Sequence, residues 1–184
     1  MARGQANKIV KLQPINDKLA FRSMVERDAL LAMIELKSLI PDLQYDLKYA
    51  NKNNFTGKRL YPKNTRTTYL RRNPALALVK VAEELRRKGL GIKIWDAYRP
   101  YRTTVRIWEL IQDERFVANP SKGSGHNRGT AVDLTLIDLR TGLELEMPTP
   151  FDDFSPAAFH GAANVAEVRI RNRSVLRAAM EKFG

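Results

Sequence analysis

The sequence predicts an α+β fold, a single domain in which helices flank a small, mainly antiparallel sheet. Its 184 residues suffice for one domain with a hydrophobic core of its own. No repeat, low-complexity tract or Pro/Gly/Ser-rich linker divides the chain. Helical patterns of apolar residues lie towards both ends of the chain, and short strand patterns lie between them. This order of elements is typical of the α+β class.

Two helices are expected in the first half of the chain. One should cover residues 18–40, because apolar residues recur there at helical spacing and Pro41 ends the pattern. The other should begin at Asn73, a suitable N-cap, with Pro74 in its first turn, and should end before Gly89. The apolar positions of the first helix include Leu19, Met24, Leu31, Ile34 and Leu36. The buried face of the second is predicted to comprise Leu76, Val79, Val81, Ala82 and Leu85.

The second half of the chain alternates between strands and helices. Residues 92–95 and 132–137 have the composition of short strands, and 143–147 is a weaker strand candidate. Residues 100–112 and 172–182 have the apolar spacing of helices. The inward positions of the last helix are expected to be Val175, Leu176, Ala179 and Met180.

A histidine and a carboxylate near the second strand suggest a metal site. In residues 132–137 an apolar row faces a core, which turns Asp133 to the opposite face of the strand. The turn between His126 and Asp133 can fold back so that the imidazole and the carboxylate meet at one cation, and zinc accepts this pair of donors. The alternative is that His126 is an ordinary surface residue and Asp133 caps a turn.

The overall composition narrows the classes of function. The absence of cysteine excludes disulfides, a thiol nucleophile and thiolate-bound zinc. No segment has the roughly 20 apolar residues of a membrane span, and residues 1–18 lack the apolar core of a signal peptide. We therefore expect a cytoplasmic protein, or a periplasmic one from which an export signal has been removed. The net charge of +12 comes from Lys and Arg spread along the chain, which favours a solvated basic surface over a nucleic-acid interface.

Arg99 lies where a predicted strand gives way to a predicted helix, in the run WDAYRP at 95–100. Pro100 disfavours the α conformation in the residue before it, so the Arg99 side chain should point away from the helix. Its guanidinium can hold a carboxylate, or the oxyanion of a tetrahedral intermediate, through two hydrogen bonds. The alternative is a structural ion pair with Asp96.

Three motifs in this order resemble the D-alanyl-D-alanine dipeptidases, zinc peptidases of the D,D-peptidase and hedgehog-like group. They are WDAYRP (95–100), GSGHNRGTAVDLTL (123–136) and PFDDF (150–154). The segments YA (49–50) and NFTG (54–57) and the last predicted helix add to the resemblance. It implies a catalytic domain at 43–184 and an amino-terminal helical extension at 1–42 that packs on this domain.

The resemblance implies a zinc site with a cationic partner. His126 and Asp133 would be two of three ligands of one zinc ion per chain, and Arg99 would stabilise the oxyanion formed on the peptide carbonyl. In the family the third ligand, a His, and the general base, a Glu, belong to a Glu-Trp-Trp-His segment that would follow Gly184. This chain contains no such segment, so we expect the 184-residue form to bind zinc weakly and turn over poorly. His160, the other histidine, is not expected to replace the third ligand.

The resemblance also implies how the substrate is held. The substrate-binding residues would be Asp152 and Tyr49 at the ammonium end of D-Ala-D-Ala and Ser124 at its carboxylate end. Such a pocket would favour the free dipeptide over longer chains, because a buried charge without a partner is costly. The alternatives are that Asp152 or Asp153 caps a turn, Tyr49 belongs to the core and Ser124 only shapes its loop.

The implied function is zinc-dependent hydrolysis of D-Ala-D-Ala to two D-alanines, in cell-wall peptide metabolism or glycopeptide resistance. A non-catalytic binder of peptides or cell-wall fragments and a zinc D,D-carboxypeptidase are alternatives on the same fold. Binding of nucleic acid through the basic surface is a less favoured third alternative. The sequence indicates no particular oligomeric state.

Overall fold

The computed structural model describes residues 13–184, which contain two small sheets. Strand β4 (Leu90–Asp96) is the centre of a three-stranded sheet. It pairs in parallel with β2 (Gln44–Tyr45) and antiparallel with β5 (Asp133–Asp138). In a two-stranded antiparallel sheet, β1 (Met33–Glu35) pairs with β3 (Tyr69–Arg71). Antiparallel pairing predominates, and the α+β class predicted from the sequence is confirmed.

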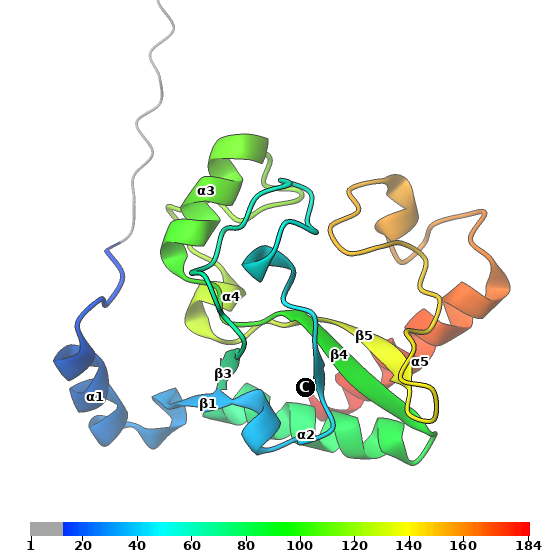
Figure 1. Cartoon of the computed structure of the whole chain (residues 1–184), viewed down its shortest axis with the longest axis horizontal. Coiled ribbons are helices and arrows are strands. Elements are labelled where there is room, and N and C mark those ends of the chain that lie inside the picture. The colour runs from blue at the N-terminus through cyan, green and yellow to red at the C-terminus, as the bar shows by residue number, and fades with distance from the viewer. Residues whose placement is uncertain (1–12) are drawn as a thin grey trace, which may run out of the picture.

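The helices differ in how they lie relative to the three-stranded sheet. Figure 1 shows α2 (Arg72–Arg86) and α5 (Glu167–Phe183) against the sheet, whereas α3 (Tyr101–Ile111) lies beyond the carboxyl end of β4. Helix α1 (Lys18–Arg27) contributes no buried residue, and α4 (Gly125–Arg128) is a single turn before β5. The described residues also form 3-10 helices at Ala29–Leu31, Leu36–Ser38, Lys48–Ala50 and Pro156–Ala158.

The main core lies between the three-stranded sheet and the helices α2 and α5. Its most buried side chains, each at most 2% exposed, include Leu78, Leu85, Ile92, Ile94 and Leu136. Val175, Leu176, Ala179 and Met180 of α5 pack in this core, as predicted, and Phe183 joins them. A second cluster near α3 contains Tyr49, Leu60, Tyr61, Ile107 and Val117. The two cores together hold the carboxyl end of β4 and the start of β5 in place.

The predicted helix at residues 18–40 is wrong over its second half. Helix α1 ends at Arg27, and Asp28 is extended and caps the following turn with its side chain. Strand β1 comes next, and the Glu35 carboxylate caps the 3-10 turn after it. Local capping by these acids and strand pairing with the distant β3 outweigh the helical spacing of apolar residues. Leu36 is fully buried in the main core, so part of the segment 1–42 packs within the domain. The division at residue 42 stays a prediction, and residues 1–12 lie outside the described chain.

Helix α2 differs in detail from its prediction. It begins at Arg72, so Asn73 and Pro74 lie in its first turn and Asn73 is not the N-cap. Leu76 is 45% exposed, and the side chain that faces the core in this turn is Ala75. The buried stripe follows the helical period from the observed start, through Ala75, Leu78, Val81, Ala82 and Leu85.

The other predicted elements correspond to β4, β5, α3 and α5, with some shifted ends. The strand at 132–137 is buried on both faces instead of one, because Thr135 and Ile137 are each 1% exposed. The candidate strand at 143–147 forms only a bridge between Ile137 and Glu144. The chain turns back at Gly142, whose φ is +72°, and leaves β5 after this single bridge.

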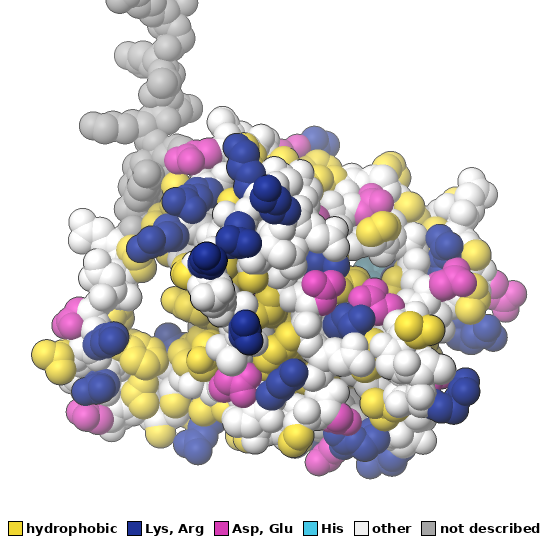
Figure 2. All heavy atoms as spheres, viewed as in Figure 1, with side chains coloured by type: hydrophobic (Ala, Val, Ile, Leu, Met, Phe, Trp, Pro, Cys, Tyr) yellow, Lys and Arg dark blue, Asp and Glu magenta, His cyan; other side chains and the backbone are white. Residues whose placement is uncertain are grey.

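Within residues 13–184 no helix is long and apolar enough to cross a bilayer. Figure 2 shows Lys and Arg side chains gathered on one part of the visible face, over α3 and the segment that precedes β3. Residues 51–66 carry five exposed cations and no acidic residue; the cations are Lys52, Lys58, Arg59, Lys63 and Arg66. Part of the net positive charge is thus concentrated on one region of the surface.

Candidate active site

The candidate site forms where β4 and β5 begin to separate. Their pairing is regular as far as Ile94 and Leu134 and then shifts, so that Asp96, and not Trp95, lies opposite Asp133. An irregularity of this kind redirects the side chains at the end of a strand. Two carboxylates directly across a strand pair repel each other. This arrangement therefore requires cationic side chains or a metal ion nearby.

His126 approaches the two carboxylates from the single turn α4. Ser124 caps this turn: its Oγ accepts from the backbone N–H of Asn127 at 3.1 Å, and the Asn127 side chain accepts from the Ser124 N–H at 3.0 Å. The Asn127 amide also donates to the carbonyl of Arg99 at 2.8 Å, which ties α4 to the connection after β4. Nδ1 of His126 lies 2.8 Å from the carbonyl of Ala97. Because a carbonyl only accepts, a neutral His126 carries its proton on Nδ1 and leaves Nε2 free to bind a metal.

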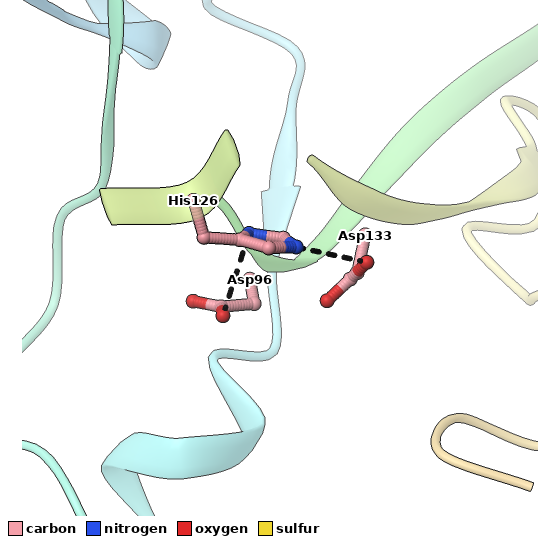
Figure 3. A group of neighbouring side chains, drawn as sticks. All are labelled: Asp96, His126 and Asp133. Carbon is pink, nitrogen blue, oxygen red and sulfur yellow. Dashed lines mark ion pairs between the residues drawn. The ribbon is translucent and has the colours of Figure 1, made fainter. Parts of the chain in front are cut away.

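His126, Asp133 and Asp96 form a group of potential metal ligands, with one donor atom from each within 4.8 Å of the others. Figure 3 shows the imidazole between the two carboxylates, each facing a different ring nitrogen. Nε2 is 3.5 Å from Oδ1 of Asp133, close to the roughly 3.3 Å that separates two donors of a tetrahedral zinc ion. Nδ1 is 3.7 Å from Oδ2 of Asp96 but already donates to a carbonyl. An imidazole nitrogen and a carboxylate oxygen at this spacing fit a metal ion of the zinc type.

Without a bound metal, the negative charge of Asp133 affects the pKa of His126. Burial acts to lower the pKa of His126, but the hydrogen bond to Asp133 and the Asp133 charge outweigh this effect and raise the pKa. A proton and a metal ion would therefore compete for Nε2 at pH values above the ordinary pKa of histidine.

Asp96 is fully buried and is bound by Arg99. Its Oδ2 accepts from Nε of Arg99 at 2.8 Å and lies 2.8 Å from Nη2, while Tyr61 donates to Oδ1. Burial raises the pKa of Asp96, and Arg99 opposes this rise. Desolvation acts to lower the pKa of Arg99, but Asp96 outweighs it, so the guanidinium stays charged. Nη2 also lies 3.6 Å from Oδ2 of Asp133. Arg99 thus makes the structural ion pair with Asp96, and one of its nitrogens also lies near Asp133; its role towards a substrate stays a prediction.

Tyr49 connects Arg99 with the segment that carries Asp152. The Tyr49 hydroxyl donates to Oδ2 of Asp152 at 2.7 Å, and its ring centroid lies 5.0 Å from the Arg99 guanidinium carbon. Tyr49 is 2% exposed, so it is a core residue whose hydroxyl also reaches the site. Asp152 has a φ of +56°, which is uncommon for a residue other than glycine. Burial raises the pKa of Asp152 to about 6, although the Tyr49 hydrogen bond opposes this shift.

A cavity of about 540 Å³ lies beside these groups. Its lining comes from the ends of β4 and β5, the segment 147–160 and helix α5, and includes Trp95, Asp133, Phe151, Asp152, His160 and Arg173. A mostly apolar lining with a few ionisable groups is typical of small-molecule sites. The His160 carbonyl accepts from Arg173 at 2.9 Å, which holds this segment on α5.

The predicted site residues His126, Asp133, Arg99, Tyr49 and Asp152 lie in one connected group. Ser124 caps α4, and Asp153 caps a turn through the backbone N–H of Ser155. Sequence reasoning missed Tyr61 and Asn127. The spacing of Ser124 and Asn127 is that of a capping box and could have indicated the second, whereas nothing around Tyr61 indicates a contact with a residue 35 positions later.

The chain is similar to proteins of one known family. The model of the D-ala-D-ala dipeptidase family matches residues 30–184. A D-alanyl-D-alanine dipeptidase of Escherichia coli K12 is 35% identical over 152 residues, which cover 83% of this chain and 77% of the relative. Similar enzymes of Enterococcus faecium and Streptomyces coelicolor are 31% and 32% identical, and the matches cover 81% and 79% of this chain and 83% and 81% of those relatives.

Proposed function

The chain belongs to the D-Ala-D-Ala dipeptidase family of metallopeptidases, and we propose that it hydrolyses D-Ala-D-Ala to two D-alanines with zinc as its metal. The proposal rests chiefly on the short distances from Asp133 to Arg99 and to His126. A guanidinium nitrogen of Arg99 lies 3.6 Å from Asp133, whose other oxygen lies 3.5 Å from Nε2 of His126. A metal-binding pair and a permanent cation therefore border the same space.

His126 and Asp133 would hold the zinc ion through Nε2 and a carboxylate oxygen. When bound, zinc activates a water molecule and polarises the peptide carbonyl. The hydrogen bond from Nδ1 to the Ala97 carbonyl fixes the ring orientation and the tautomer, which keeps Nε2 directed at the metal position. The two residues thus contribute a preformed part of the metal site.

Arg99 would stabilise the oxyanion that develops on the peptide carbonyl. Asp96 and the Tyr49 ring hold its guanidinium, and burial strengthens its interaction with any charge that forms next to it. Because the group is positioned before the substrate arrives, little reorganisation is needed in the transition state.

Asp152 and Ser124 would bind the two ends of the dipeptide. A pKa of about 6 leaves the Asp152 carboxylate largely ionised at pH 7, and its half-buried position favours a cation such as the substrate ammonium. The Ser124 Oγ accepts a hydrogen bond as the cap of α4, and its own proton remains able to donate to the substrate carboxylate. A peptide without a free ammonium group would leave the Asp152 carboxylate without a cationic partner, which would select for the dipeptide.

The test is release of D-alanine by the purified full-length protein supplied with zinc. We expect hydrolysis of D-Ala-D-Ala, no hydrolysis of N-acetyl-D-Ala-D-Ala or L-Ala-L-Ala, loss of activity with a chelator, and recovery with zinc but not with magnesium. Equal cleavage of the acetylated dipeptide would identify a carboxypeptidase. Binding of the dipeptide without cleavage would identify a non-catalytic binding protein.

Two further expectations are independent of catalysis. The basic surface over residues 51–66 would bind DNA with a steep dependence on salt if nucleic acid were its partner. We expect weak binding at physiological salt, because the two aromatic side chains among these cations pack inside the protein: Tyr61 is buried and Phe55 contacts Phe154. The cytoplasmic location stays a prediction, which cell fractionation would test.

A further inference from the structure

Tyr61 is held rigidly beside the ion pair of Asp96 and Arg99. The backbone N–H groups of Leu60 and Tyr61 both donate to the carbonyl of Tyr49, at 2.9 and 3.0 Å. The Tyr61 side chain is only 7% exposed, and its ring contacts the Tyr49 ring edge-on with centroids 5.9 Å apart. Its hydroxyl donates to Oδ1 of Asp96. The position of this hydroxyl is therefore fixed by both backbone and packing.

The two oxygens of Asp96 have different partners. Oδ2 takes both donors of Arg99, with Nε and Nη2 each at 2.8 Å, while Oδ1 takes the proton of Tyr61. A free carboxylate beside a guanidinium normally pairs through both oxygens, in two parallel hydrogen bonds. Tyr61 takes one acceptor site of the oxygen that such a pairing would need and holds the carboxylate in an orientation in which the guanidinium meets only Oδ2. As a result, Nη2 of Arg99 is shared between Asp96 and the space towards Asp133, 3.6 Å away.

We propose that Tyr61 is a positioning residue for Arg99. By holding Oδ1 of Asp96 it prevents a two-oxygen pairing that would draw the guanidinium towards Asp96 and neutralise it. One edge of the guanidinium is thereby kept available to the oxyanion next to the metal position. This inference rests on the proposed role of Arg99 in the hydrolysis of the dipeptide.

The protonation state of Tyr61 supports this role. Burial, and then the charge of Asp96, raises the pKa of Tyr61, while Arg99 opposes the rise. The hydroxyl therefore stays protonated near neutral pH and can donate its hydrogen bond to Asp96.

The test compares Tyr61→Phe with Tyr45→Phe. The Tyr45 hydroxyl also donates to a carboxylate, Oε1 of Glu35 at 2.7 Å, but outside the candidate site. For Tyr61→Phe we expect kcat for D-Ala-D-Ala to fall about 10- to 100-fold, with KM changed less than about twofold. For Tyr45→Phe both constants should stay near those of the unchanged protein.

A second measurement does not depend on turnover. The nitrogen NMR signal of the Arg99 Nε–H group, assigned by its loss in Arg99→Lys, reports the hydrogen bond to Asp96. We expect Tyr61→Phe to shift this signal and Tyr45→Phe to leave it in place. An unshifted signal, or an unchanged kcat in an active enzyme, would overturn the proposal. A shifted signal in a protein that never cleaves D-Ala-D-Ala would instead support the positioning by Tyr61 and refute the proposed function.

Discussion

Nη2 of Arg99 lies 3.6 Å from Oδ2 of Asp133, although 34 positions separate the two residues in the chain. The cation comes from the connection after β4, and the carboxylate is the first residue of β5. Their proximity means that a metal held by Asp133 and the guanidinium of Arg99 would border the same space. The ion pair of Arg99 with Asp96 keeps this cation in place without using all of its donors.

Replacing Arg99 should impair the chemical step more than binding. For Arg99→Ala we expect kcat to fall about 10²- to 10³-fold, the loss typical of removing one oxyanion donor, with a smaller change in KM. Arg99→Lys should recover little, because an ammonium cannot reproduce the planar pairing with Asp96. Arg86→Ala, which removes an exposed bidentate pair with Asp42, is the matched control and should leave kcat unchanged. Steady-state kinetics would contradict the assignment if Arg99→Ala raised only KM.

Recognition of the substrate ammonium should depend on pH through Asp152. Its pKa is raised to about 6, so the carboxylate gains a proton as the pH falls through that value. The protonated form cannot pair with an ammonium, so kcat/KM for D-Ala-D-Ala should decrease below pH 6 on the acid side of the profile. Asp152→Asn should lower kcat/KM at pH 7 by about tenfold or more and remove this limb of the profile.

Asp153→Asn is the control for that experiment. Asp153 neighbours Asp152, but its carboxylate accepts from the backbone N–H of Ser155 at 2.7 Å. An asparagine can accept the same hydrogen bond, so kcat/KM and its pH dependence should be preserved. A loss in Asp153→Asn as large as that in Asp152→Asn would refute the assignment of the ammonium to Asp152.

Zinc affinity should increase as the pH rises through the pKa of His126, which is raised above the usual histidine value. The metal needs the unprotonated Nε2, so binding must release the proton. Without metal, the protonated His126 beside Asp133 stabilises the fold at low pH, and this contribution is lost as the pH rises through the raised pKa. Competition with a zinc-binding dye would measure the affinity. His126→Ala should strongly lower the zinc affinity, whereas an equal loss in His160→Ala would show that the ligands are misassigned.

Any larger residue in place of Gly129, which ends the α4 turn, should lower the free energy of unfolding. Its φ is +71°, and a Cβ there would lie 2.9 Å from Cε of Met33 and 3.2 Å from the backbone nitrogen of Arg71. Gly57 has a similar φ of +62° but nothing within 4 Å of such an atom. Both alanine substitutions incur the strain of a left-handed backbone, about 1 kcal/mol, but Gly129→Ala should lose about 1–3 kcal/mol more from overpacking. Equal losses in the free energy of unfolding, measured with urea, would show that the close contacts relax freely.

The parts of this protein that could be predicted from sequence are those governed by local patterns. The alternation of apolar residues with Asp133 and Thr135 in 132–137 indicated a strand whose Asp133 side chain points away from the main core. Pro100 indicated the start of α3. His126, Asp133, Arg99 and Asp152 could be named as candidate site residues because each lies in a short, recognisable motif. Within such a motif the chain conformation depends mainly on residues that are adjacent in sequence, so it can be predicted from the sequence alone.

The features that escaped prediction depend on distant segments. The helical spacing in 18–40 gave way to β1 because β3, more than 30 residues later, offers strand pairing that spacing cannot reveal. Tyr61 reaches Asp96 only because the segment at 60–61 is bound to the Tyr49 carbonyl. Long-range pairing and packing of this kind leave no periodic trace in the residues themselves.

The irregular pairing between Ile94 and Asp96 depends on one extra residue in β4, so the number of residues there decides which side chains face the site. Removing one residue there would restore a regular ladder and turn one of the two opposed carboxylates towards the other face of the sheet, because side chains alternate along a strand. Residues 113–123, which connect α3 with α4, pair with no strand and can change in length without this effect. During evolutionary divergence, insertions and deletions should therefore accumulate in that connection. A related protein that has lost the extra residue of β4 should lack the carboxylate pair and should not hydrolyse the dipeptide.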